Sequence, residues 1–120
     1  MDFRETNYES SNTTDWIAIL LNIAIPDGRH RIIGTVLAPY LINVKGLQVS
    51  EAEKIIGSWL EKCDRYEPVK GNIEAFVKRS CLNAYRLGKK PKDINYFKTH
   101  HNTIYREIVS MAHSYELEIE

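Results

Sequence analysis

The uncharged segment at residues 32–44 is the feature that most restricts how this chain can fold. Its large apolar side chains recur every three or four residues, at Ile33, Leu37, Tyr40, Leu41 and Val44. This spacing is typical of one buried face of an α-helix and differs from the alternation of a half-buried strand. Pro39 lies inside the pattern, and because proline has no backbone N–H we expect a kink or a break there. Gly46 is expected to end the segment.

Residues that favour helix starts precede the neighbouring apolar segments. Thr14 or Asp15 can cap a first helix over "WIAILLNIA", which Pro26 ends. Ser50 and Glu53 have the spacing of a capping box, so we expect a helix that starts there and ends near Cys63.

Further helices are expected in the C-terminal half. Asn72 can cap one of them and Gly88 can end it. A short turn is expected at residues 94–97, and Asn102 can cap a last helix. No segment has the alternation and turn residues of a strand. The predicted fold class is therefore all-α, a compact bundle of five to six short helices.

Length and composition indicate one domain. The chain has 120 residues, with 43% hydrophobic and 27% charged residues. We expect a flexible N-terminal tail over residues 1–12, a single helical domain over 13–115 and an acidic end over 116–120. The two cysteines form no CxxC pair and the start lacks a signal-peptide h-region, so we expect a cytoplasmic protein. No apolar run is long enough for a bilayer, and no membrane association is expected.

Basic residues gather in one stretch although the formal net charge is zero. Residues 75–92 contain six basic side chains and no acidic one. Asn83 and Arg86 share a helix face that leads to Lys89 and Lys90, and such a surface can hold phosphates. A merely solvated helix face fits the spacing equally well.

A second basic cluster, Arg29, His30 and Arg31, stands at the head of the long apolar segment. A helix is expected to start near Asp27 or Gly28, and its first N–H groups lack internal partners. Two guanidinium groups and an imidazole beside them would form a site for a polyphosphate. The alternative is that the cluster only solvates the helix end. Asp27 is the expected N-cap, and its carboxylate would repel a phosphate unless it pairs with an arginine.

The sequence contains no pattern that indicates catalysis or a metal site. It has no GxSxG, P-loop, GxGxxG or HExxH motif. The acidic pair of Glu51 and Glu53 is accounted for by the expected helix cap. His100, His101 and His113 are expected to be surface and helix-end residues, because no suitable ligand set accompanies them. We therefore expect a noncatalytic protein.

Three segments, in this order, resemble one known family. They are "GRHRIIGTVLAPYLINVKGLQVSEAEKII" (28–56), "NAYRLGKKPKDINYF" (83–97) and "HNTIYREIV" (101–109). They are similar to the C-terminal domain of the large primase subunit of archaea and eukaryotes, PriL. They are most similar to the archaeal primase accessory subunits of the PriX family. The resemblance covers residues 15–112, which is nearly all of the expected globular part.

The resemblance implies a noncatalytic subunit of a heterotrimeric DNA primase. Such a subunit binds the initiating nucleotide, or the 5′-triphosphate end of the RNA primer, and template DNA, beside the small catalytic and large primase subunits. The positions that match the family's nucleotide-binding residues are Arg29, His30, Arg31, Asn83 and Arg86. Possible further nucleic-acid contacts are Tyr85, Lys89 and Lys90.

One departure from the large-subunit pattern concerns cofactors. That domain carries four cysteines that hold an iron–sulfur cluster, whereas this chain has only Cys63 and Cys81. No iron–sulfur cluster and no other cofactor are therefore expected, as in the PriX-like relatives. Two alternatives remain open. The chain could be a template- and nucleotide-binding helix bundle of a plasmid primase–polymerase, or a helical DNA-binding regulator or protein-interaction module.

Overall fold

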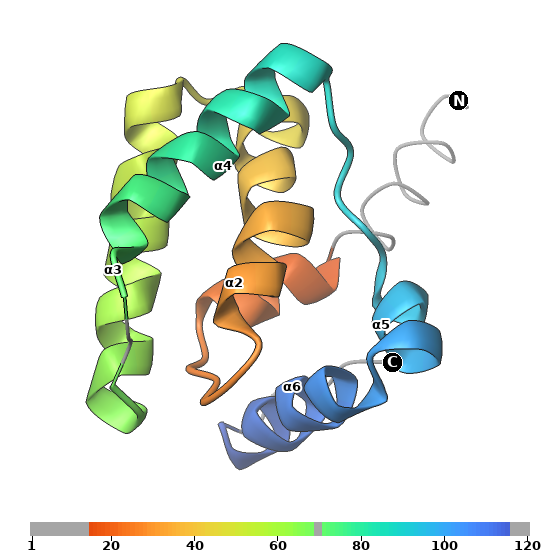
Figure 1. Ribbon diagram of the computed structural model, residues 1–120. Helices are drawn as coiled ribbons and strands as arrows, with labels where there is room; N and C mark the ends of the chain where they lie inside the picture. Colours follow the sequence, from red (N-terminus) through yellow and green to blue (C-terminus); the bar gives the residue numbers. More distant parts are fainter. Residues whose placement is uncertain (1–14, 69–70, 116–120) are drawn as a thin grey trace.

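The computed structural model describes residues 15–68 and 71–115, and these form a bundle of helices (Figure 1). No strand occurs among them, which confirms the all-α class. A first helix covers residues 15–21. The others are α2 (Arg29–Ile32), η1 (Ile33–Leu37), η2 (Tyr40–Val44), α3 (Val49–Tyr66), α4 (Ile73–Leu87), α5 (Ile94–His100) and α6 (Asn102–Ser114). The expected tail at 1–12 and the acidic end at 116–120 lie outside the described residues.

α2, η1 and η2 form one uninterrupted helix from Arg29 to Val44, which we call the central helix. η1 and η2 are π-helical, and Ala38 and Pro39 between them are α-helical. Pro39 has no N–H for the Thr35 carbonyl, which would be its partner in a regular α-helix. The Thr35 carbonyl accepts the backbone N–H of Lys92 at 3.0 Å. The sequence suggested a kink or a break at Pro39; the helix does not break there, but widens around the proline and continues.

The core surrounds this central helix. Its large apolar side chains are buried, as the periodicity predicted, with the exception of Val44, which is 46% exposed near the helix end. α3 and α4 pack beside the central helix (Figure 1). The indole N–H of Trp59 on α3 donates to the carbonyls of Leu20 and Ile23 at 3.0 and 2.9 Å. These bonds join α3 to the end of the first helix.

Several predicted helix ends differ from those in the structure. α3 starts at Val49, and its capping box is formed by Gln48 and Glu51 rather than by Ser50 and Glu53. The Gln48 N–H donates to the Glu51 carboxylate at 3.0 Å. The earlier start brings Val49 against the core, which stabilises this register. α3 also continues beyond Cys63 to Tyr66.

The ends of α4 were predicted correctly, and those of the last two helices were not. The Asn72 side chain accepts the Ala75 N–H, and Gly88 closes α4 with φ 60°. α5 is a full helix because Asp93 caps it through the Tyr96 N–H at 2.9 Å. His101, not Asn102, precedes α6. The Asn102 amide donates back to the Lys98 carbonyl at 3.1 Å and so ties α6 to α5. Asp15 is already helical, and Thr14 lies outside the described residues.

α5 and α6 form a hairpin at one side of the bundle (Figure 1). Gly28 lies directly against α6: a Cβ atom there would be 2.7 Å from Cδ1 of Ile104. Gly28 also has φ 75°, a conformation that glycine adopts without strain. The start of the central helix is therefore held close to the start of α6. Within the described chain, no helix has the length and apolar character needed to cross a membrane.

Candidate nucleotide-binding site

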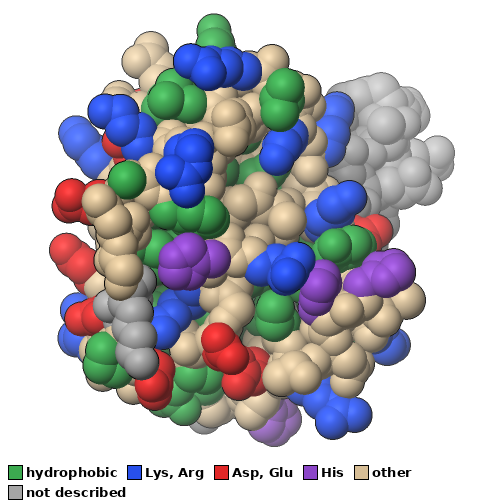
Figure 2. Space-filling view, viewed as in Figure 1, with side chains coloured by type: hydrophobic (Ala, Val, Ile, Leu, Met, Phe, Trp, Pro, Cys, Tyr) green, Lys and Arg blue, Asp and Glu red, His purple; other side chains and the backbone are tan. Residues whose placement is uncertain are grey.

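The central helix and α4 form a surface on which the chain concentrates its positive charge. Segments 28–50 and 75–92 contain no acidic residue, and the two helices that they form contact each other. They carry more than half of the chain's 16 lysines and arginines: Arg29, Arg31, Lys45, Arg79, Arg86, Lys89, Lys90 and Lys92, and also Lys78, which lines the groove toward α3 instead of this surface. Figure 2 shows Lys and Arg side chains over the upper and central part of this face. The absence of acidic residues from residues 28–50 was not among the predictions made from the sequence.

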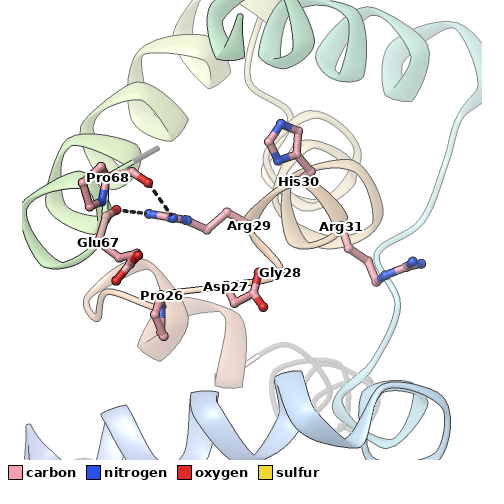
Figure 3. Close-up of a pocket in the computed structure, with 8 residues that line it drawn as sticks. All are labelled: Pro26, Asp27, Gly28, Arg29, His30, Arg31, Glu67 and Pro68. Atoms are coloured by element: carbon pink, nitrogen blue, oxygen red, sulfur yellow. Dashed lines mark hydrogen bonds between the residues drawn. The ribbon is translucent and has the colours of Figure 1, made fainter. Parts of the chain in front are cut away.

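A hollow of about 670 Å³ lies at the start of the central helix (Figure 3). Its walls come from the turn before α2, from α2 itself and from the end of α3. The residues that line it are Pro26, Asp27, Gly28, Arg29, His30, Arg31, Glu67 and Pro68. The structure thus places the whole predicted Arg–His–Arg cluster at one hollow, but its three side chains point in different directions.

Arg29 points to the C-terminal end of α3 (Figure 3). Its Nη1 donates to the carbonyls of Glu67 at 2.6 Å and Cys63 at 3.3 Å, and its Nη2 donates to the Pro68 carbonyl at 3.3 Å. Carbonyls at a helix end lack partners within the helix and carry partial negative charge. Arg29 therefore caps α3, and these carbonyls offset part of its charge.

His30 and Arg31 are exposed and point in different directions, His30 upward and Arg31 to the right in Figure 3. The His30 ring lies against Phe76 on α4, with 4.7 Å between ring centroids. Arg31 points away from Arg29, and its charge acts on His101 at the start of α6. Desolvation of the half-buried His101 lowers the pKa of its imidazole, and the positive charges of Arg31 and His100 lower it further. The charges of Arg31 and His100 thus reach the start of α6, while two acidic residues, Asp27 and Glu67, line the same hollow.

Asp27 takes neither of the roles expected for it. Gly28, not Asp27, is the residue before the helix, and Asp27 Oδ1 accepts the Gly28 N–H at 2.8 Å. No ion pair joins Asp27 to an arginine within the part of the chain that is described. Asp27 instead lies near Glu107 of α6. Burial and then the Asp27 charge raise the pKa of Glu107, whose Oε1 is buried without a hydrogen-bond partner among the described residues.

The second predicted cluster lies at the C-terminal end of α4. Arg86, Lys89, Lys90 and Tyr85 are exposed there, and Asn83 is half-buried. Asn43 of the central helix holds this end in place, because its amide donates to the carbonyls of Ala84 at 2.9 Å and Lys89 at 2.6 Å. Sequence reasoning missed Asn43. The signal was a lone amide in an otherwise apolar helical segment.

The two predicted clusters do not meet in one pocket. His30 contacts α4 at Phe76, in the first turns of that helix, whereas Arg86 lies near its end. At 1.5 Å per residue, the helix rises about 15 Å between these two positions. The basic residues therefore line a long surface, with one cluster at each end.

The described residues contain no group of three or more His, Cys, Asp or Glu side chains able to hold a metal ion. Cys63 and Cys81 are buried on different helices, α3 and α4. Burial raises the pKa of Cys81 to about 11, and burial also raises the pKa of Cys63. Both thiols are thus held protonated within the core.

The sequence matches the family model Primase X (PriX) over residues 10–112. A search of curated proteins gives no significant match. The matched region includes the whole central helix, the hollow at its start and the basic end of α4. Because the match extends over most of the chain, the protein belongs to the Primase X family.

Proposed function

We propose that this protein is a noncatalytic subunit of a DNA primase that binds the initiating nucleotide, or the 5′-triphosphate end of an RNA primer, together with template DNA. In this role it promotes the start of primer synthesis, and the partner small subunit performs the catalysis. Membership of the Primase X family supports a primase-related accessory role. The triphosphate contacts that we propose are the exposed His30 and Arg31.

The observation that carries this proposal is the surface free of acidic residues formed by the central helix and α4. A chain with no formal net charge that separates its charges in this way has a local attraction for polyanions. At the start of the central helix, unpaired backbone N–H groups add to the charge of Arg31. A guanidinium group suits phosphate because its N–H groups match two phosphate oxygens at once.

Arg29 has a different part in this proposal. Three of its hydrogen bonds go to carbonyls at the end of α3, so it fixes the start of the central helix relative to α3. It contributes to the triphosphate site mainly by holding His30 and Arg31 in position. Asn83, Arg86, Lys89 and Lys90 are proposed as phosphate contacts at the far end of α4, with Tyr85 as a stacking contact beside them.

The test is the affinity for RNA primers annealed to template DNA, with either a 5′-triphosphate or a 5′-hydroxyl end. We expect the protein to prefer the triphosphate end, and expect Arg31→Ala and His30→Ala to lose that preference. Arg65→Ala is a matched control, because Arg65 is an exposed arginine on α3. Equal affinity of the unaltered protein for the two ends would overturn the proposal.

The proposed partners are the small catalytic and large primase subunits. Co-purification of the untagged chain with both of them is the expected result. If the chain separates from both subunits at moderate salt, its assignment as a subunit is wrong, whatever its affinity for nucleotides.

A further inference from the structure

We infer that the nucleotide site continues along α4 as a track for a single-stranded oligonucleotide, with Arg79 as its middle contact. This inference rests on the proposed function, because it takes the 5′ end of the strand to lie at His30 and Arg31. It adds that the two basic clusters are the two ends of one binding surface. The ligand class is therefore an oligonucleotide of several residues rather than a mononucleotide.

The first observation is a row of three contacting side chains that joins the central helix to α4. The Phe76 ring lies 4.7 Å from the His30 ring, between centroids, and the Arg79 guanidinium carbon is 5.5 Å from the Phe76 centroid. Phe76 is half-buried, whereas His30 and Arg79 are exposed. The phenyl ring thus holds an imidazole and a guanidinium group at the surface, and the guanidinium stays free to bind a phosphate.

The second observation is the order of side chains along α4. Arg79, Asn83 and Arg86 are spaced by four and three residues and share one face of the helix. Leu87, which is 68% exposed, follows Asn83 by four residues and so continues this face. This face offers guanidinium groups and the Asn83 amide for phosphates, and an apolar side chain for a base. Arg79 lies between the two clusters and bridges the gap that separates them.

The third observation is that the far end of this face is anchored. The Lys89 carbonyl accepts from the Asn43 amide at 2.6 Å, and the Lys92 N–H donates to the Thr35 carbonyl at 3.0 Å. The loop that carries Lys89 and Lys90 is therefore tied to the central helix on both sides. A loop held in this way loses less conformational entropy when it binds a phosphate.

The length of the track sets the length of the ligand. From Phe76 to Leu87 the helix rises about 16 Å, at 1.5 Å per residue. A stacked strand advances about 3.4 Å per nucleotide. The track thus accommodates about five nucleotides.

The length dependence of binding tests this directly. A 5′-triphosphate mononucleotide, dinucleotide and longer oligoribonucleotides, up to about twice the predicted length, are titrated against the full chain. We expect the affinity to rise with each added nucleotide and to level off at about five. An affinity that is already maximal for the mononucleotide would overturn the track. If it still depended on Arg31, the proposed function would stand.

Arg79→Ala and Lys78→Ala form the matched pair of variants. Both residues are exposed and adjacent on α4, but Lys78 lines the groove between α4 and α3 and lies off the track. We expect Arg79→Ala to weaken binding of the five-nucleotide ligand by about tenfold and to leave mononucleotide binding unchanged. It should also lower the slope of log affinity against log salt by about 0.7. Lys78→Ala should leave binding unchanged.

The outcomes separate the two levels of the proposal. Equal losses in Arg79→Ala and Lys78→Ala would show unspecific attraction and overturn the track. A ligand series that depends on neither the 5′-triphosphate nor Arg31 would overturn the proposed function itself. Thermal melting of each variant, followed by circular dichroism, checks that the exposed substitutions leave the fold intact.

Discussion

The guanidinium group of Arg29 donates a hydrogen bond of 2.6 Å to the backbone carbonyl of Glu67, which joins the first turn of the central helix to the end of α3. In the sequence Arg29 is one of three equivalent-looking basic residues. In the fold it is a structural link, and His30 and Arg31 remain at the surface. The cluster therefore combines one residue that holds the helix start with two that face solvent.

Arg29→Ala should destabilise the fold. The substitution removes the donors of three carbonyl groups and leaves the end of α3 without its cap. We expect a loss of about 1–3 kcal/mol in the free energy of unfolding. Urea denaturation followed by the fluorescence of the buried Trp59 measures it.

Arg31→Ala is the control for this prediction, because Arg31 is exposed. It should change the free energy of unfolding by no more than about 0.5 kcal/mol. Similar losses in both variants would contradict the structural role assigned to Arg29. Arg29→Lys should fall in between, since an ammonium group keeps the charge but not the two-armed geometry.

Pro39→Ala should loosen the basic loop without unfolding the helix. Alanine supplies the N–H that proline lacks, and this N–H can bond to the Thr35 carbonyl in competition with Lys92. We expect faster amide hydrogen exchange at Lys92, together with an unchanged or higher melting temperature.

Gly34→Ala is the matched control for Pro39→Ala. It lies in η1 of the same central helix, adds no backbone donor, and its Cβ would have 4.0 Å contacts with Phe76 and Ser80. Amide hydrogen exchange at Lys92 should be unchanged in Gly34→Ala. Unaltered exchange in Pro39→Ala would mean that the loop does not depend on the proline.

Glu107→Gln should gain stability relative to the unaltered protein as the pH rises. Burial and the neighbouring Asp27 raise the pKa of Glu107, so the folded state binds the proton more tightly than the unfolded state does. The contribution of the Glu107 carboxyl group to the free energy of unfolding is therefore present at low pH and is lost as the pH rises through the folded-state pKa. The urea concentration at the unfolding midpoint should be the same for the two proteins at about pH 4 and higher for the variant at about pH 7.

Glu61→Gln, at an exposed position of α3, is the control for this pH series. It should show no gain of the same kind. A difference between Glu107→Gln and the unaltered protein that stays constant from acid to neutral pH would disprove the linkage to Glu107.

His101 should report on anion binding near Arg31. Desolvation lowers the pKa of its imidazole, and so do the charges of Arg31 and His100. A bound triphosphate would offset these positive charges, so the pKa of His101 should rise when the ligand is present. An NMR titration of the imidazole protons measures this shift. His113, near the other end of α6, is the internal control and should not respond.

Local patterns in the sequence predicted the helices well. The spacing of Ile33, Leu37 and Leu41 identified the buried face, because burial follows directly from helical periodicity. The start of α3 was harder to predict. Ser50 with Glu53 and Gln48 with Glu51 both have the three-residue spacing of a capping box, and the contact of Val49 with the core favours the second.

The candidate site was predictable only in part, because contacts with residues far away in the sequence decide which of its side chains are bonded within the fold and which are exposed. Arg29 bonds to a carbonyl 38 residues away, and His30 packs on Phe76 of another helix. No local pattern indicates which of three adjacent basic residues will meet those partners. Asn43 was missed for the same reason, since its amide has a role only when α4 ends beside it.

The concentration of positive charge on the surface of the central helix and α4 has a consequence for how the protein meets a nucleic acid. A molecule with no formal net charge has no overall attraction to a polyanion, but this one gathers basic residues on the surface formed by the central helix and α4. In the field of a nucleic acid the protein would rotate before contact, so that the surface of the central helix and α4 faces the nucleic acid. Salt would then reduce the fraction of correctly oriented encounters more than the total number of encounters.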